Sequence, residues 1–71
     1  MNNVNEGALY LVSLAKQVTN GSAVHLAALK ALGEAGGPAA QDYLVSLAKQ
    51  LTNGSALHLA TIEALGKASR N

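Results

Sequence analysis

Two histidines occupy the same position in two copies of a repeated segment, and they are the side chains of this chain best suited to chemistry. His25 and His58 each follow a Gly-Ser pair, in the contexts Gly-Ser-Ala-Val-His and Gly-Ser-Ala-Leu-His. A neutral imidazole can bind a metal ion, transfer a proton or change its charge near neutral pH. A structural metal site needs about four ligands, and the chain has no cysteine to join the histidines. We therefore expect no metal ion and no other cofactor.

The placement of the histidines on their helices favours a structural role instead. On an α-helix, the His25 imidazole would lie on the side opposite the charged residues Lys30 and Glu34. It would point inward or into an interface, hydrogen-bond a neighbouring loop or serine, and connect adjacent repeats. If the imidazoles are buried, we expect acidification to destabilise the fold. A metal-linked assembly through His25 and His58 is a distant alternative.

No set of residues predicts a catalytic centre. Ser13, Ser46 and Asp42 could complete a hydrolytic triad with a histidine on paper. However, Asp42 lies in the first turn of a predicted helix, where the helix dipole already explains a carboxylate. The sequence also lacks a glycine-rich phosphate-binding loop. We therefore expect the protein not to be an enzyme.

Composition and charge exclude further classes of partner. The 71 residues carry a formal net charge of +1, which gives no basic field for nucleic acid. No stretch reaches the roughly 18 uninterrupted apolar residues of a membrane span, and the first residues lack the pattern of a signal peptide. We expect no nucleic-acid partner, no membrane association and a cytoplasmic location.

The chain is one motif written twice at a spacing of 33 residues. Tyr10–Ala35 aligns with Tyr43–Ala68, and the two segments differ at only six positions. A period of this length is typical of stacked repeat proteins. We interpret the chain as a single domain, residues 1–71, with repeat units over about 5–37 and 38–71. The near-identity indicates a recent duplication or a designed, symmetrised sequence.

Each unit is predicted to form two helices. In the first helix of each unit, apolar residues recur at positions i, i+3, i+4 and i+7, which predicts an amphipathic helix. These stripes are Leu11, Leu14, Ala15 and Val18 in the first copy and Leu44, Leu47, Ala48 and Leu51 in the second. Asn3 with Glu6 would cap the first stripe's helix, and Pro38 would begin the helix of the second.

The second helix of each unit is predicted over about 23–35 and 56–68. The Thr-Asn-Gly segments at 19–21 and 52–54 would end the preceding helices through left-handed Asn and Gly conformers. Ser22 and Ser55 would cap the helices that follow. Because the second helix is apolar nearly all round, we expect it to be buried on more than one side.

The segment Val24–Gly36, followed by Pro38-Ala39-Ala40 and the leucines of the second stripe, resembles a HEAT-like repeat. The resemblance covers nearly the whole chain, with His25 and His58 where the family usually has arginine, and Gly37 where it usually has a loop aspartate. It implies an α-solenoid that binds protein partners on a concave face. The segments 21–27 and 54–60 also resemble the opening of an ankyrin repeat, but the continuous helix predicted over 39–51 leaves no room for its β-hairpin. DNA-reading helical repeats share the 33-residue period, but the low positive charge argues against them.

The predicted fold is all-α: an α-solenoid of four helices in helical hairpins, completed by oligomerisation. Repeat arrays generally need at least about three units and polar terminal caps, whereas this sequence holds two units with apolar outer helices. We expect a homo-oligomer, most simply a two-fold dimer. The interface candidates are Tyr10, Val12, Tyr43, Val45, His25, His58, Leu59 and Ile62.

Two functions are compatible with this fold. The first is a self-assembling scaffold without a natural ligand. The second is a module that binds another protein on a concave face, which would include Gln41, Asp42, Val45, Ser46 and Lys49 with their first-copy counterparts. A binding face should differ between repeats, yet Val12 and Val45 are the same residue, as are Lys16 and Lys49. The sequence therefore favours the scaffold.

Overall fold

Four helices make up most of the chain. The computed structural model describes residues 6–70, and its elements are α1 (Glu6–Gln17), α2 (Ala23–Ala35), α3 (Gly37–Gln50) and α4 (Ala56–Arg70). No strand occurs within residues 6–70, so the all-α prediction is confirmed for this part of the chain. None of these four helices is long and apolar enough to cross a membrane.

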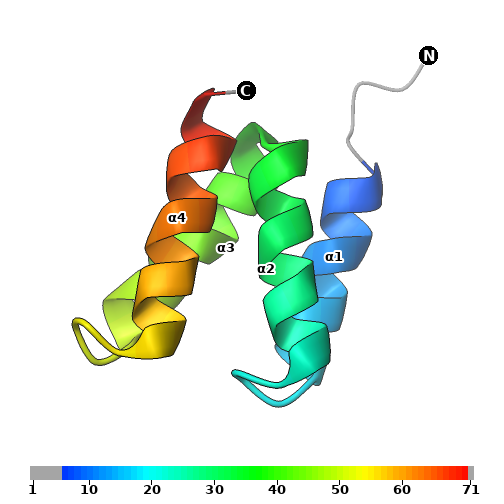
Figure 1. Cartoon of the computed structure of the whole chain (residues 1–71). Helices are drawn as coiled ribbons and strands as arrows, with labels where there is room; N and C mark the ends of the chain where they lie inside the picture. Colours follow the sequence, from blue (N-terminus) through cyan, green and yellow to red (C-terminus); the bar gives the residue numbers. More distant parts are fainter. Residues whose placement is uncertain (1–5, 71) are drawn as a thin grey trace.

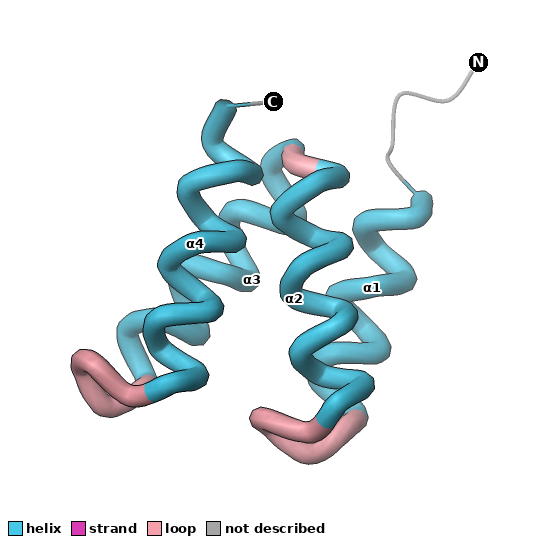
Figure 2. The backbone as a smooth tube through the Cα atoms, viewed as in Figure 1, coloured by secondary structure: helices cyan, strands magenta, loops and turns pink. Residues whose placement is uncertain are grey.

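The helices form two antiparallel hairpins that pack side by side (Figure 1). α1 and α2 make the first hairpin, and α3 and α4 make the second. α2 and α4 contact each other in one layer, and α1 and α3 contact each other in the layer behind. Figure 2 shows the two longer loops at one end of the molecule and the short α2–α3 connection at the other. Because α2 contacts each of the other three helices, it is buried on more than one side, as its sequence predicts.

Serine caps begin the second helix of each hairpin. Ser22 has an extended backbone, with φ −68° and ψ 165°, and its Oγ accepts a hydrogen bond from the N–H of His25 at 3.2 Å. Ser55 Oγ accepts the equivalent bond from the N–H of His58 at 3.1 Å. Each cap satisfies an N–H group that has no partner within its own helix. Both predicted caps are confirmed.

The glycines before these serines turn the chain. Gly21 and Gly54 have φ of 85° and 86°, in the region that glycine enters without steric penalty. Every described residue with a positive φ is a glycine. The prediction that Asn20 and Asn53 would also adopt left-handed conformers is therefore wrong. One residue suffices to reverse the chain, because the following serine is already extended.

The remaining predicted helix ends agree with the structure to different degrees. Asn3, the proposed cap of α1, lies outside the described residues. Pro38 is in the first turn of α3, as predicted, where its missing N–H leaves no hydrogen bond unmade. α2 covers the predicted range, and α4 runs to Arg70, slightly past its predicted end.

The core consists of alanine and leucine. The buried hydrophobic residues of the described chain are Ala8, Ala15, Ala28, Leu29, Leu32, Ala40, Leu44, Leu47, Ala64 and Ala68. The two predicted stripes are buried to different depths: Leu44 is fully buried, whereas its equivalent Leu11 is only partly so. α3 has neighbours on both sides, in α1 and α4, whereas α1 lies at the edge. Near-identical segments are thus buried according to their place in the stack.

Candidate functional site

His25 joins the two hairpins through a short chain of hydrogen bonds. The backbone N–H of Gly21 donates to His25 Nδ1 at 3.0 Å, and Nε2 lies 3.1 Å from the hydroxyl oxygen of Tyr43. His25 is 0% exposed, which confirms that it points inward. The imidazole therefore links the α1–α2 loop to α3, the first helix of the second hairpin.

The partners of the imidazole define its protonation. A backbone N–H can only donate, so Nδ1 of His25 must accept and the neutral ring carries its proton on Nε2. Nε2–H then donates to the Tyr43 oxygen. A second proton on Nδ1 would break the bond from Gly21 and place a charge in a buried position.

Burial acts on both members of this pair. It lowers the pKa of His25 below the ordinary value of 6.5, because desolvation disfavours the imidazolium ion. It raises the pKa of the Tyr43 hydroxyl above its ordinary 10.0 for the same reason, since the phenolate is the charged form. The pair is therefore held neutral, as a structural contact requires.

The second copy contains the same local arrangement without the tyrosine. Gly54 N–H donates to His58 Nδ1 at 3.0 Å, as Gly21 does to His25. His58 is partly exposed, and its Nε2 makes no hydrogen bond to any residue in 6–70. Tyr10, the first-copy equivalent of Tyr43, is 65% exposed. A second histidine and a second tyrosine are therefore present, but within residues 6–70 they do not pair with each other.

A second contact between the hairpins depends on a glycine in the middle of α2. A Cβ atom placed on Gly33 would lie 3.0 Å from both the Cα and the carbonyl oxygen of Ala64. A side chain at this position would therefore require α4 to shift by a few tenths of an ångström. Gly66, the equivalent of Gly33, has nothing within 4 Å of such an atom. Ala31, the equivalent of Ala64, is partly exposed on α2.

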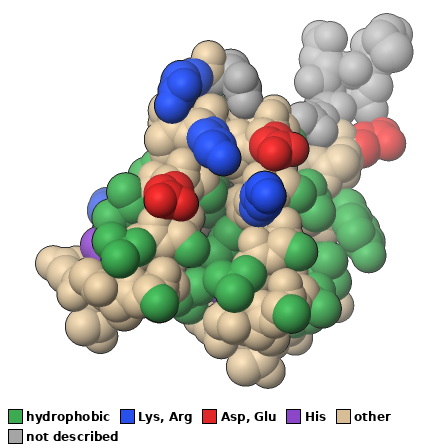
Figure 3. Space-filling view, viewed as in Figure 1, with side chains coloured by type: hydrophobic (Ala, Val, Ile, Leu, Met, Phe, Trp, Pro, Cys, Tyr) green, Lys and Arg blue, Asp and Glu red, His purple; other side chains and the backbone are tan. Residues whose placement is uncertain are grey.

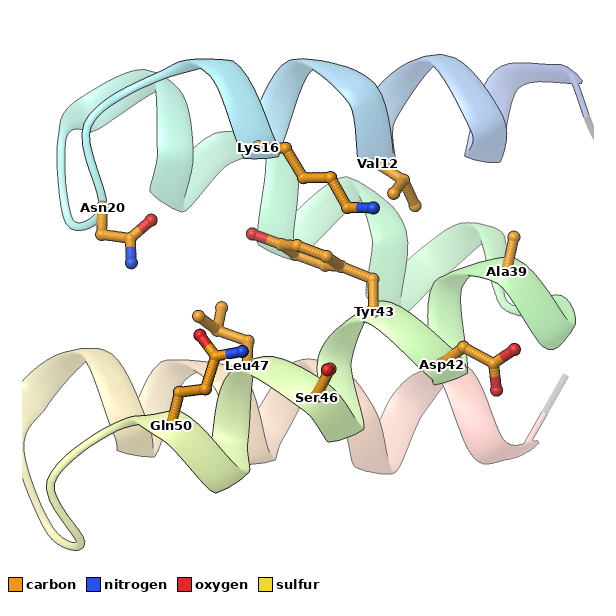
Figure 4. Close-up of a pocket in the computed structure, with 9 residues that line it drawn as sticks. All are labelled: Val12, Lys16, Asn20, Ala39, Asp42, Tyr43, Ser46, Leu47 and Gln50. Carbon is orange, nitrogen blue, oxygen red and sulfur yellow. The ribbon is translucent and has the colours of Figure 1, made fainter.

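A groove runs between α1 and α3 (Figure 4). It is lined by apolar and polar side chains of both helices and of the α1–α2 loop: Val12, Lys16, Asn20, Ala39, Asp42, Tyr43, Ser46, Leu47 and Gln50. Lys16 extends toward the Tyr43 ring, and Val12 points to the same side. Of the residues predicted for a concave face, Asp42 and Ser46 line this groove, whereas Val45 and Lys49 do not. Gln41 is directed elsewhere, because its side-chain amide donates to the carbonyl of Ala68 on α4.

The proposed catalytic and metal-binding combinations are not assembled. The His25 ring nitrogens are bound by Gly21 and Tyr43 rather than by Ser46 or Asp42. Within residues 6–70, no three His, Cys, Asp or Glu side chains gather where they could hold a metal ion. The arrangement supports packing and hydrogen bonding between helices.

The eight interface candidates divide by burial. His25, Tyr43 and Val12 take part in contacts within the chain: His25 is fully buried, and the other two pack partly buried against the core. As a correction, a completely buried His25 cannot contact a second molecule. The remaining candidates are exposed or partly exposed: Tyr10, Val45, His58, Leu59 and Ile62.

The Gly33–Ala64 contact was missed from the sequence, although a signal for it was present. A glycine inside a helix is unfavourable by about 1 kcal/mol relative to alanine. Gly33 and Gly66 each interrupt an otherwise strongly helical segment. Such a glycine, with no turn to explain it, indicates a close helix–helix approach.

Comparison with known proteins adds no relative: no family model, curated protein or solved structure matches this chain.

Proposed function

We propose that the protein is a non-enzymatic helical-repeat scaffold that associates with copies of itself, with each hairpin acting as one unit of an α-solenoid. The observation that supports this most is the unequal burial of equivalent residues. Leu29 is 1% exposed in the contact between the hairpins, whereas its equivalent Ile62 is 45% exposed on α4. Tyr43 is partly buried, whereas Tyr10 is largely exposed.

These differences follow from position rather than from residue type. The residues that bury one hairpin against the other recur on the outer sides of α1, α2 and α4, where nothing in residues 6–70 covers them. Val24, Leu59 and Ile62 are 50%, 54% and 45% exposed. A chain of 71 residues buries only about 60% of its unfolded surface, so association would add apolar burial that the single chain lacks.

Light scattering tests the scaffold function. The molar mass should exceed the 7.2 kDa of one chain at high concentration and fall on hundredfold dilution. A chelator should leave the mass unchanged, because the contact is between protein side chains. A folded species of one-chain mass at every concentration would contradict the proposal.

The groove between α1 and α3 favours a second candidate, a module that binds another protein. Lys16 and Asp42 carry opposite charges in this groove, and the Tyr43 ring lies between its walls. Tyrosine is enriched at protein interfaces. If the groove bound a partner, Asp42→Lys would abolish capture of that partner while leaving self-association intact. If the protein is a scaffold only, it captures no partner, and Asp42→Lys leaves its self-association unchanged.

A further inference from the structure

We propose that copies of this chain associate head to tail, so that α4 of one copy packs against α1 and α2 of the next through the same contacts that join the two hairpins within the chain. The inference rests on the proposed self-association and specifies its geometry. The leading face is Tyr10, Val24, Ala27 and Ala31, on α1 and α2. The trailing face is His58, Leu59, Ile62 and Gly66, on α4.

The His–Tyr pair gives the first correspondence. His25 of the first hairpin donates to Tyr43 of the second. His58 is fixed in the same way as His25 by its own Gly-Ser loop, so its Nε2–H is already oriented. Tyr10 is exposed on the leading face. A head-to-tail contact would let His58 of one copy donate to Tyr10 of the next.

The glycine contact gives a second and independent correspondence. Gly33 lets the Ala64 backbone approach so closely that a Cβ on Gly33 would lie only 3.0 Å from it. Gly66 on the trailing face likewise has no Cβ, and the space beside it is open. Ala31 offers the matching small residue on the leading face. The next copy could therefore approach α4 as closely as α4 approaches α2.

Apolar exposure follows the same pattern. Leu26, Leu29 and Ala60 line the groove between α2 and α4; Leu29 is 1% exposed there and Leu26 is 41% exposed. Their equivalents Leu59 and Ile62 are exposed on the trailing face, and Ala27, the equivalent of Ala60, is exposed on the leading face. Residues equivalent to those on each side of the internal groove are thus exposed on an outer face of the molecule.

The charge reversals between the copies suit continued stacking. Lys30 on α2 lines one groove with Glu63 and Lys67 of α4, and Glu34 lines another with Lys67. Acidic and basic side chains accordingly alternate over the two helices (Figure 3). At a head-to-tail junction, Glu63 and Lys67 would face Lys30 and Glu34 of the next copy. Opposite charges would again meet, whereas unreversed copies would place like charges at matched positions.

The leading and trailing faces would each bind another copy of this chain. This contact continues an interface that already exists within the molecule, whereas a two-fold contact has no such internal counterpart. Each copy carries one leading and one trailing face, so association does not stop at two chains. Such heterologous contacts build a ring if the rotation closes and a filament if it does not.

Two charged variants and their mixture test the geometry. Gly66→Arg would block the trailing face; a Cβ there meets nothing within 4 Å in the single chain, so the fold should be retained. Ala27→Arg, at an exposed position, would block the leading face. Each variant alone should need at least a tenfold higher concentration, corresponding to about 1.4 kcal/mol, to associate. Their equimolar mixture should form a species of about twice 7.2 kDa, since one intact face of each kind remains.

Matched controls make every outcome decisive. Thr19→Arg adds the same charge in an exposed loop and should associate like the unchanged chain. Circular dichroism checks that each variant is helical; if either fails to fold, Leu59→Lys and Tyr10→Glu block the same faces at exposed positions. A mass that stops at two chains for the unchanged protein, or a mixture that stays monomeric, would overturn the head-to-tail geometry but leave self-association standing. A monomeric unchanged chain would overturn both.

Discussion

His25 Nε2 and the hydroxyl oxygen of Tyr43 lie 3.1 Å apart, across 18 residues of sequence, and their hydrogen bond joins the first hairpin to the second. The residues of this pair also differ in environment from their equivalents in the other copy. His25 is fully buried, whereas His58 is partly exposed, and Tyr43 is partly buried, whereas Tyr10 is 65% exposed. Near-identical segments thus serve as matched controls for one another.

Removing the Tyr43 hydroxyl should destabilise the fold. Tyr43→Phe leaves the buried Nε2–H of His25 without an acceptor, and we expect the free energy of unfolding to fall by about 1–3 kcal/mol. Tyr10→Phe removes the same group where it is exposed and should change stability by less than about 0.5 kcal/mol. Urea unfolding at concentrations where the chain is monomeric measures both. Equal effects of the two variants would show that the His25–Tyr43 bond does not hold the hairpins together.

Acidification should weaken the fold through His25. Because burial lowers the pKa of His25 in the folded protein below 6.5, the unfolded chain binds the proton more readily. The contribution of His25 is complete above pH 6.5 and is lost as the pH falls toward the lowered pKa. The thermal unfolding midpoint should therefore drop between pH 8 and pH 5. A flat midpoint over this range, or an unchanged slope in His25→Gln, would argue against the prediction.

Alanine at the two helical glycines should have opposite effects. Gly66→Ala places a methyl group in open space and should stabilise the monomer by about 0.4–1 kcal/mol. Gly33→Ala forces its methyl group to 3.0 Å from the Ala64 backbone, and such overpacking typically costs about 1–3 kcal/mol. Differential scanning calorimetry of the two variants gives the comparison. A Gly33→Ala protein as stable as Gly66→Ala would mean that α2 and α4 can separate at no cost.

Alanine substitution of the equivalent residues Leu32 and Leu65 should have unequal effects on stability, because only Leu32 is fully buried. Leu32 is fully buried, and Leu32→Ala should cost about 2–5 kcal/mol. That is a large part of the stability of a small domain, so the variant should be largely unfolded by circular dichroism. Leu65, its partly exposed equivalent on α4, should tolerate the same change with its helical signal retained. The reverse order would contradict the observed burial.

Local features of the fold could be predicted from the sequence because they depend on near neighbours. The bounds of α2, the caps at Ser22 and Ser55, and the inward direction of His25 follow from helix periodicity and capping chemistry. The left-handed asparagines were predicted wrongly, because Gly21 and Gly54 alone make the turns. Each of these helix bounds, caps and turns is determined by a few consecutive residues.

The contacts between hairpins could not be predicted in the same way. Tyr43 becomes the partner of His25 only after α3 has packed against α2, and periodicity within one helix does not give that register. The Gly33–Ala64 approach likewise depends on how α2 and α4 cross. Tyr10 and Gly66 are the exposed equivalents of Tyr43 and Gly33. They can be recognised as candidate contact residues only once the His25–Tyr43 and Gly33–Ala64 contacts are known.

Covalent trapping of the proposed junction tests the account most directly. The chain contains no cysteine, so Ala31→Cys combined with Gly66→Cys introduces one thiol on each outer face. The equivalent internal atoms, a Cβ on Gly33 and the Cβ of Ala64, would lie 3.3 Å apart, close to the roughly 3.5–4.5 Å of a disulfide. Mild oxidation followed by mass spectrometry should give a ladder of covalent multimers beyond two chains, which neither single variant forms. Uncrosslinked chains only, or dimers formed equally well by a single variant, would contradict head-to-tail stacking.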